Sequence, residues 1–202
     1  MTKIQEMKTV YVVGGDPAVE KMFEKKGFIP TGPNGLYLET HEPDLICFTG
    51  GADISPYLYG EEPDGARGCD PIRDEFEKQV YEKYVGEAPF VGICRGGQLL
   101  NVLNGGKLVQ DHGLISGYVS MWELFEQDGI EHKVFVDHHQ GILPTEEAVG
   151  FIHGPDIPSG EHIAYACFYP KTRSLCFQPH PEWGHKETEN IFFDLVKECL
   201  KL

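Results

Sequence analysis

The 202-residue sequence is poor in basic residues and has no long apolar run. Lys and Arg total 17 against 32 Asp and Glu, which gives a formal net charge of −15, and the basic residues form no cluster. This balance disfavours binding to nucleic acid or to an anionic membrane surface. No run approaches the roughly 20 apolar residues that span a bilayer, and the N-terminus lacks the apolar core of a signal peptide. We therefore expect a cytoplasmic protein.

The six cysteines include no closely spaced pair. They are Cys47, Cys69, Cys94, Cys167, Cys176 and Cys199. Because this spacing matches neither a zinc site nor a redox dithiol, we expect most to be free thiols, with Cys47, Cys167 and Cys176 buried in apolar runs. His138 and His139 are adjacent and would point to opposite faces of a strand, and the glycine pairs do not form a dinucleotide fingerprint. The sequence predicts neither a metal nor a cofactor.

Apolar runs that end in glycine alternate with amphipathic segments in the first half of the chain. The expected strands there are 8–15, 43–51 and 88–93, and the expected helices are 17–28, 72–86 and 95–106. The second half contains expected strands at 132–137, 148–154, 161–169 and 173–180 and a final helix at 185–201. This alternation predicts an α/β fold with a mainly parallel sheet and helices on both faces. The length predicts one domain over residues 1–202.

One cysteine stands between two glycines, in the sequence GICRG at 92–96, directly after an apolar strand and before a helix. This pattern is typical of a nucleophile elbow, a sharp turn that holds one side chain above the edge of the sheet. The turn would place Cys94 at a helix N-terminus, where free N–H groups and the helix dipole favour a thiolate. The alternative is a small buried residue at a helix entry, as most intracellular cysteines are.

The segment QPHPEWG at 178–184 supplies the two further groups that a cysteine nucleophile requires, a base and an acceptor that orients it. His180 and Glu182 are two residues apart, so their side chains lie on the same side of an extended segment. We therefore predict a catalytic triad in which Glu182 orients His180 and His180 faces Cys94.

An oxyanion hole requires backbone N–H groups beside the nucleophile. We predict that Arg95 supplies one and that Gly51, in the sequence TGGAD after a neighbouring strand, supplies the second. For the glycines the alternative is a simple strand-end turn. Asp74 and Glu77 either begin a solvated helix or hold Arg95 near the elbow, and we favour the second interpretation.

Five motifs occur in order along the chain. They are FTGGADISPYLYGE at 48–61, DPIRDEFE at 70–77, VGICRGGQLLNVLNGGKLVQD at 91–111, DHHQGI at 137–142 and QPHPEW at 178–183. In these motifs the sequence resembles the class I glutamine amidotransferase-like superfamily and, within it, the γ-glutamyl hydrolase branch (peptidase C26, γ-glutamyl-γ-aminobutyrate hydrolase-like). The resemblance implies a flavodoxin-like sheet and a Cys, His, Glu triad at Cys94, His180 and Glu182.

The same resemblance implies substrate-binding residues. Gln98 occupies the position that helps hold the substrate glutamine, and VDHHQG places His138 and Gln140 on the matched positions of the motif S-x-H-x-Q-G. The sequence departs from the family pattern at Val136, where a serine is usual, and at Pro179, where a bulky residue is common. The stretch from 111 to 137 is shorter than in typical members.

The resemblance implies a cysteine-dependent hydrolase that cleaves the γ-glutamyl amide of a small molecule through a thioester. The second hypothesis is a glutaminase that passes ammonia from glutamine to a partner synthase, which would require an exposed apolar docking surface. The third is a catalytically degenerate binding module, against which the intact Cys, His and Glu argue. The sequence indicates neither the leaving amine nor the oligomeric state.

Overall fold

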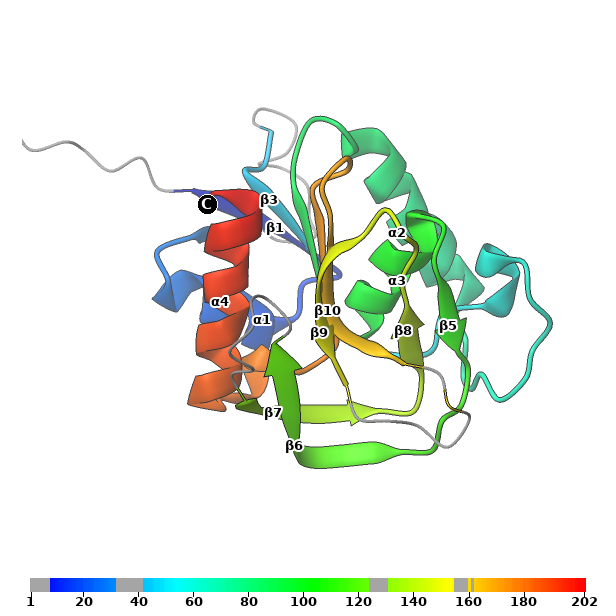
Figure 1. The fold of residues 1–202 in the computed structure, drawn as a ribbon. Helices are drawn as coiled ribbons and strands as arrows, with labels where there is room; N and C mark the ends of the chain where they lie inside the picture. The colour runs from blue at the N-terminus through cyan, green and yellow to red at the C-terminus, as the bar shows by residue number, and fades with distance from the viewer. Residues whose placement is uncertain (1–7, 32–41, 124–130, 155–159, 161) are drawn as a thin grey trace, which may run out of the picture.

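One eleven-stranded sheet organises the part of the chain that the structure describes, residues 8–31, 42–123, 131–154, 160 and 162–202 (Figure 1). In this computed structural model the strand order is β2-β1-β3-β4-β11-β10-β9-β6-β7, and β8 pairs with both β10 and β5. The strands are β1 (Thr9–Val13), β2 (Ile29–Thr31), β3 (Leu45–Phe48), β4 (Phe90–Ile93), β5 (Lys107–Val109), β6 (Ile115–Glu123), β7 (Glu131–His138), β8 (Gly141–Leu143), β9 (Val149–His153), β10 (Ala164–Tyr169) and β11 (Ser174–Phe177).

The five strands β2, β1, β3, β4 and β11 are parallel neighbours. Every residue of β1, β3, β4 and β11 is buried, as expected of strands that helices cover on both faces. The prediction of a mainly parallel central sheet with helices on both faces is therefore confirmed. Beyond β11 the strands β10, β9, β6 and β7 pair in antiparallel fashion, a change of direction that the sequence prediction did not include.

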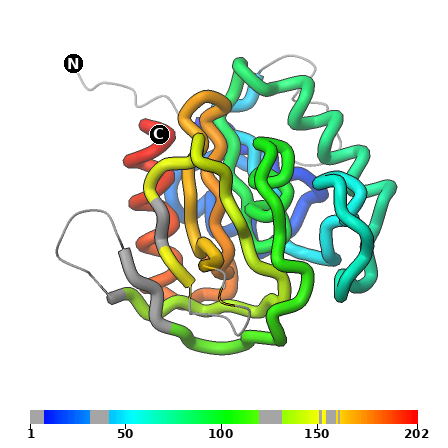
Figure 2. Tube along the Cα trace, turned by 45° about the vertical axis from the view of Figure 1, so that its right-hand side comes forward, coloured from blue at the N-terminus to red at the C-terminus, as the bar shows by residue number. Residues whose placement is uncertain are grey.

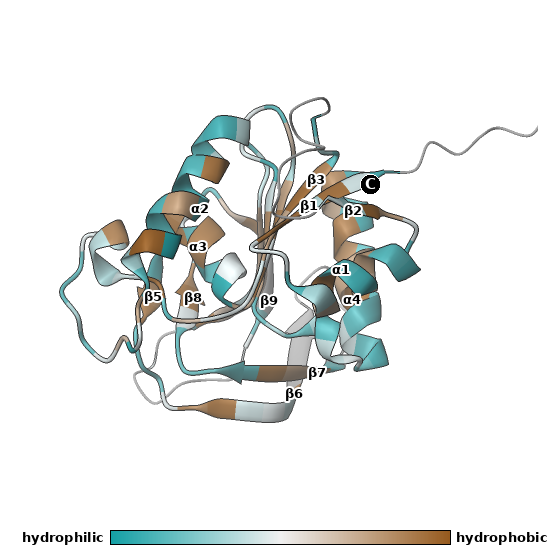
Figure 3. Ribbon diagram, turned by 180° about the vertical axis from the view of Figure 1, so that it is seen from behind, coloured by the Kyte–Doolittle hydropathy of each residue, from teal (hydrophilic) through white to brown (hydrophobic). Residues whose placement is uncertain are grey.

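The helices lie in two pairs on opposite faces of the sheet (Figures 1 and 3). They are α1 (Pro17–Lys25), α2 (Pro71–Tyr84), α3 (Arg95–Leu103) and α4 (Lys186–Leu200). The apolar residues of α1 and α4 close one hydrophobic cluster, and those of α2 and α3 close the other. Among the described residues, no helix combines the length and the apolar character needed to cross a membrane.

The first turns of α1 and α2 have the same chemistry. Asp16 Oδ1 accepts a hydrogen bond from Ala18 N at 2.8 Å, and Asp70 Oδ1 accepts from Ile72 N and Arg73 N at 3.2 and 3.1 Å. In each case the aspartate is the N-cap and a proline follows at the first helical position. Because the N-cap fixes the residue at which α2 begins, it also fixes which charged side chains of the helix face the sheet.

The β6–β7 hairpin lies across the end of the sheet at which β4 passes to α3 (Figure 2). His180 N donates to Phe135 O on β7 at 2.9 Å, which joins the hairpin to the segment after β11. Val136, on the same strand, is fully buried in the hydrophobic cluster of α1 and α4. The departure from serine at this position thus places an apolar side chain in the core.

The structure contains four strands that the sequence did not predict, namely β2, β5, β8 and the nine-residue β6. The strands β2, β5 and β8 have three residues each, too few to show a hydrophobic period. The long loop after β3 contains the 3₁₀ helix η1 (Pro56–Tyr59). The segment predicted to continue in extended form after His180 instead turns into the 3₁₀ helix η2 (Pro181–Trp183), which Gly184 ends with φ 82°. A proline at the first position and a left-handed glycine after the last explain this turn.

The turn from β4 to α3 requires backbones to pass closely. A Cβ on Gly96 would meet the backbone of Phe48 and would lie 2.8 Å from its Cβ, and one on Gly97 would lie 2.8 Å from Phe177 N. Real Cβ atoms essentially never approach so closely, and the obstructing atoms belong largely to sheet backbone that cannot move aside. The two glycines therefore let α3 pack directly on β3 and β11.

We expect Gly96→Ala to lower the free energy of unfolding by roughly 3 kcal/mol, because an added methyl group would force β3 and α3 apart. Gly60→Ala is the matched control. It adds the same group in open space and carries only the cost of a left-handed alanine, about 1 kcal/mol. Urea denaturation of both variants measures the two losses, and equal losses would show that the close passage is unimportant.

Candidate active site

Cys94 occupies the turn between β4 and α3 in a conformation that is rare for a residue with a side chain. It is the N-cap of α3 with φ 51° and ψ −109°. Cys94 N donates to Phe177 O at 2.8 Å, and its carbonyl accepts from Gln98 N at 3.0 Å, so neighbouring elements hold the turn in place. Backbone strain of this kind persists where the surrounding structure enforces it and is frequent at active sites.

His180 and Glu182 lie beside this thiol. His180 Nδ1 donates to Glu182 Oε1 at 2.7 Å, and both side chains are almost completely buried. The His180 ring stacks on the indole of Trp183 with 3.9 Å between ring centroids and 6° between their planes. The structure thus brings Cys94, His180 and Glu182 together, although η2 rather than an extended segment presents the carboxylate.

The electrostatics of His180 favour its protonated form. Burial alone lowers the pKa of the ring, but hydrogen bonds to Cys94 and Glu182, together with the charges of these groups, outweigh burial and raise the pKa to about 10. The ring is therefore an imidazolium at neutral pH. A positively charged donor next to a sulfur is the arrangement that cysteine nucleophiles use.

Two groups around the sulfur were not predicted from the sequence. Gln178 Nε2 donates to Cys94 Sγ at 3.6 Å, and the Asp137 carbonyl oxygen lies 3.9 Å from Sγ. Gln178 lies two residues before His180, and residues two apart in an extended segment point to the same face. This spacing could have identified Gln178 from the sequence. No comparable signal exists for Asp137, because it contributes a backbone atom from a distant strand.

Gln98 is buried on the inner side of this group. Its Nε2 donates to Gln178 Oε1 at 3.2 Å and to Gln140 O at 3.3 Å. A carbonyl oxygen only accepts, so the Gln98 group that faces Gln140 O is its NH₂. The same NH₂ group faces Gln178 Oε1, and the Gln178 NH₂ is therefore the group that faces Cys94 Sγ. The side chain predicted to hold the substrate is therefore part of a chain of hydrogen bonds that ends at Cys94 Sγ.

His138 and Gln140 are buried near His180, His138 on the strand β7 and Gln140 just after it. His138 Nδ1 donates to Gln140 O at 2.8 Å, which leaves Nε2 as an acceptor. Burial, followed by the charge of His112, lowers the pKa of His138 to about 3, so the ring is neutral at physiological pH. His138 Nε2 and both polar atoms of the Gln140 amide have no hydrogen-bond partner among the described residues.

The two residues predicted to supply N–H groups to an oxyanion hole belong to the elbow and to the loop after β3. Arg95 is the first residue of α3, where a helix N–H has no intrahelical acceptor. The loop after β3 passes so close that a Cβ on Gly50 would lie 3.2 Å from His180 Cε1 and 3.8 Å from Cys94 Cβ. Gly51 follows with φ 146°, a conformation that favours glycine.

A cluster of two arginines, Arg73 and the buried Arg95, and two buried carboxylates lies behind the elbow. The Arg95 guanidinium bonds to Asp74 and to Glu77, all three being almost completely buried. Glu77 Oε1 also accepts from Arg73 Nε at 2.7 Å, and Asp74 Oδ2 accepts from Ser55 N at 3.1 Å. The prediction that these carboxylates hold Arg95 is confirmed, and the two positive charges are neutralised.

His139 turns away from His138 toward the rim of the site. Its Nε2 lies 2.9 Å from Asp53 Oδ2, and its Nδ1 lies 3.5 Å from Asp111 Oδ1. Asp111 also pairs with Arg67, which connects the long loop after η1 to the segment after β5. Within the described ranges, no group of three or more His, Cys, Asp or Glu residues is arranged to hold a metal ion.

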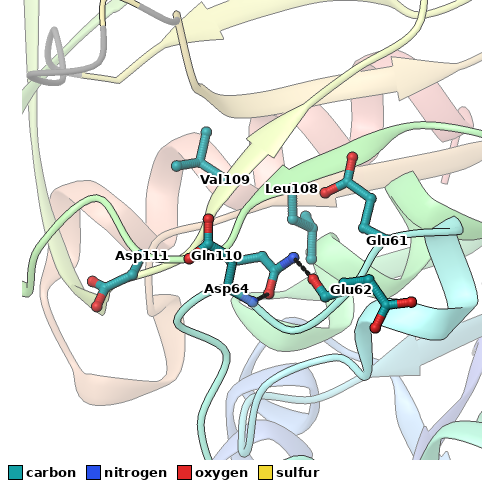
Figure 4. A pocket seen from close by; sticks show the side chains of 7 residues that line it. All are labelled: Glu61, Glu62, Asp64, Leu108, Val109, Gln110 and Asp111. Atoms are coloured by element: carbon teal, nitrogen blue, oxygen red, sulfur yellow. Dashed lines mark hydrogen bonds between the residues drawn. The ribbon is translucent and has the colours of Figure 1, made fainter.

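A pocket of about 480 Å³ lies between the loop after η1 and β5 (Figure 4). Its lining carries the carboxylates of Glu61, Glu62, Asp64 and Asp111. Gln110 crosses it, since its Oε1 accepts from Asp64 N at 2.7 Å and its Nε2 donates to Glu62 O at 2.8 Å. The triad residues do not line this pocket, and Asp111 joins it to the rim of the site through His139.

Comparison with known proteins supports a relationship by sequence. The chain is 42% identical over 170 residues to the glutamine amidotransferase-like protein YvdE of Lactococcus lactis subsp. lactis, an alignment that covers 75% of this chain and 72% of YvdE. A YvdE homologue of Lactococcus lactis subsp. cremoris is 51% identical over 115 residues, covering 54% of this chain and 61% of the homologue, less than two thirds of its length.

Solved structures support the fold. A glutamine amidotransferase of Thermotoga maritima superposes with a TM-score of 0.64 at 20% identity over 96% of this chain and 84% of that one. The PurLQS structure from the same organism gives a TM-score of 0.66 at 16% identity over 95% and 99% of the two chains.

Residues 37–150, more than half of the chain, match the Peptidase C26 family. The chain belongs to the peptidase C26 family of the class I glutamine amidotransferase-like superfamily.

Proposed function

We propose that this protein hydrolyses the γ-glutamyl amide bonds of small molecules through a thioester on Cys94. The observation that carries the proposal is a cysteine in a strained elbow beside His180, whose ring also bonds to Glu182 at 2.7 Å. Nucleophile, proton donor and orienting carboxylate are the three parts that acyl transfer requires. Membership of the peptidase C26 family supports this class of reaction.

In the first step Cys94 Sγ attacks the carbonyl carbon of the γ-amide and forms a tetrahedral intermediate. The N–H groups of Arg95 and Gly51 stabilise its oxyanion. As the C–N bond breaks, the His180 imidazolium gives its proton to the departing amine, which leaves a γ-glutamyl thioester. His180, now neutral, takes a proton from water, which attacks the thioester and releases the γ-carboxylate and the free thiol.

His138 and Gln140 supply polar groups for the bound γ-glutamyl moiety. Within the described part of the chain, their buried atoms without a partner are His138 Nε2, an acceptor, and the Gln140 amide, a donor and an acceptor. Buried polar groups in native structures are normally satisfied, so such atoms beside a nucleophile are candidates for substrate contacts. Gln98 lines the same region through its bond to Gln140 O.

A second candidate function is a glutaminase that delivers ammonia to a partner synthase. The observation in its favour is a group of exposed apolar side chains on η1 and the first turns of α2, formed by Tyr57, Ile72 and Phe76. Exposed apolar patches of this kind often mark protein interfaces. Comparison of free glutamine with γ-glutamyl amides, assayed without any partner, distinguishes the two functions.

We expect Cys94→Ala to abolish turnover while leaving the fold intact, because the thiol supplies the covalent step and alanine is no larger than cysteine. Cys199→Ala, at a half-buried thiol on α4, is the control and keeps the parental rate. The measurements are hydrolysis of γ-glutamyl-p-nitroanilide and mass spectrometry of a γ-glutamyl adduct on Cys94. A Cys94→Ala rate within tenfold of the parent would contradict the mechanism.

We expect His180→Asn to lower kcat/KM about as much as loss of the cysteine, and Glu182→Gln to lower it less. The imidazolium is present below the His180 pKa and is lost as pH rises through it. Since Glu182 raises this pKa, Glu182→Gln moves the alkaline limb of the kcat/KM profile to lower pH. A limb that stays in place or moves upward, or the opposite ranking of the two variants, would show that the roles are misassigned.

We expect γ-glutamyl amides of neutral or cationic amines to be hydrolysed faster than γ-linked glutamate oligomers. The net charge is −15, Asp74 and Glu77 neutralise the two arginines behind the elbow, and four carboxylates line the flanking pocket. A polyanion is repelled by such a field, although salt screens it beyond about 8 Å. The test is kcat/KM for both substrates at low and physiological salt, and a faster oligomer at both would refute the expectation.

A further inference from the structure

Arg73, near the start of α2, donates to the backbone of the loop after β3. Its Nη2 lies 3.1 Å from Thr49 O and 3.0 Å from Gly50 O, and it also bonds to Thr49 Oγ1 at 3.2 Å. The same guanidinium packs against Gly51, where any Cβ would collide with Nη1. One side chain thus holds two successive carbonyl groups of the loop.

These two bonds fix the direction of the N–H groups. No peptide among the described residues is cis, and in a trans peptide the C=O and N–H point in opposite directions. Because Gly50 O faces Arg73, the N–H of Gly51 points away from the guanidinium. The same loop lies against the thiol, since a Cβ on Gly50 would be 3.2 Å from His180 Cε1 and 3.8 Å from Cys94 Cβ.

We propose that Arg73 is a positioning residue that keeps the Gly51 N–H turned toward the oxyanion. The proposal rests on the function proposed above. Arg73 touches no reacting atom and acts through the loop, by holding its carbonyl groups on the far side. Without this donor the Gly50–Gly51 peptide is free to rotate, since glycine has access to most backbone conformations.

Glu77 extends this positioning to the second donor of the hole. Its carboxylate binds Arg73 Nε and the guanidinium of Arg95, whose backbone N–H is the other proposed donor. A guanidinium suits this position because Nε binds Glu77 while Nη2 of the same rigid plane binds the two carbonyl groups. The ammonium group of a lysine has no such plane, so Lys replaces Arg73 only in part.

The test compares Arg73→Met and Arg73→Lys with Lys78→Met, a control that removes one positive charge from a partly exposed position on the same helix. Two quantities are measured for each protein. The first is the pair kcat and KM for γ-glutamyl-p-nitroanilide. The second is the rate at which iodoacetamide alkylates Cys94, followed by peptide mass spectrometry. Alkylation consumes the thiolate but forms no oxyanion. Its rate therefore measures the reactivity of the Cys94 thiol independently of the oxyanion hole.

We expect Arg73→Met to lower kcat about 100-fold, the effect of losing one oxyanion donor, with KM and the alkylation rate within threefold of the parent. We expect Arg73→Lys to fall between Arg73→Met and the parent, and Lys78→Met to match the parent. If Arg73→Met fails to fold, the kcat and alkylation rate of Arg73→Lys decide by the same criterion.

The proposal is overturned if the kcat of Arg73→Met stays within threefold of the parent. It is also overturned if kcat and the alkylation rate of this variant fall together, because a joint loss means general damage to the site. Failure of the proposed function looks different, because the parent itself would then hydrolyse no γ-glutamyl amide. The parental rate therefore separates the two hypotheses before any variant is compared.

Discussion

The buried pair of carboxylates on α2 is the interaction on which the geometry of the site depends. Asp74 and Glu77 receive Arg95 from the elbow helix, Arg73 from their own helix and the backbone N–H of Ser55 from the loop after β3. Removal of one member of such a cluster leaves an uncompensated buried charge, which costs several kcal/mol. The cluster therefore locks α2, α3 and the loop after β3 into a single arrangement around Cys94.

Much of the fold and the grouping of the site residues could be predicted from local sequence. The glycines of GICRG predict an elbow because close backbone passage permits no side chain, and the structure places Gly96 against Phe48 accordingly. The carboxylates on α2 could be assigned to Arg95 because helical spacing puts Asp74 and Glu77 on one face. Where a hydrophobic period or a residue spacing extends over several residues, the local sequence is enough to predict the structure.

The remainder depends on contacts between segments distant in sequence. The carbonyl group of Asp137 reaches Cys94 from 43 positions away, and any residue type could provide it. The low pKa of His138 arises from burial, which no single segment determines. Likewise, the 3₁₀ helix η2 replaces an extended segment. Gly184 permits the left-handed conformation that ends this helix, but packing against other segments decides that the helix forms. Sequence patterns identify the side chains of the site better than its backbone contributions.

The place of β11 in the sheet has a consequence for biosynthesis. This strand follows both β4 and β10 in the sequence, yet it lies between them in the sheet, with Ser174 paired to Phe90 and Phe177 to Ala166. The two halves of the sheet can therefore join only after the ribosome has released residues 174–177. Until then, β4 and β10 each present an open edge, the feature that makes nascent chains prone to aggregate. Chaperone demand should consequently peak before β11 leaves the ribosome, just before the thiol acquires its histidine.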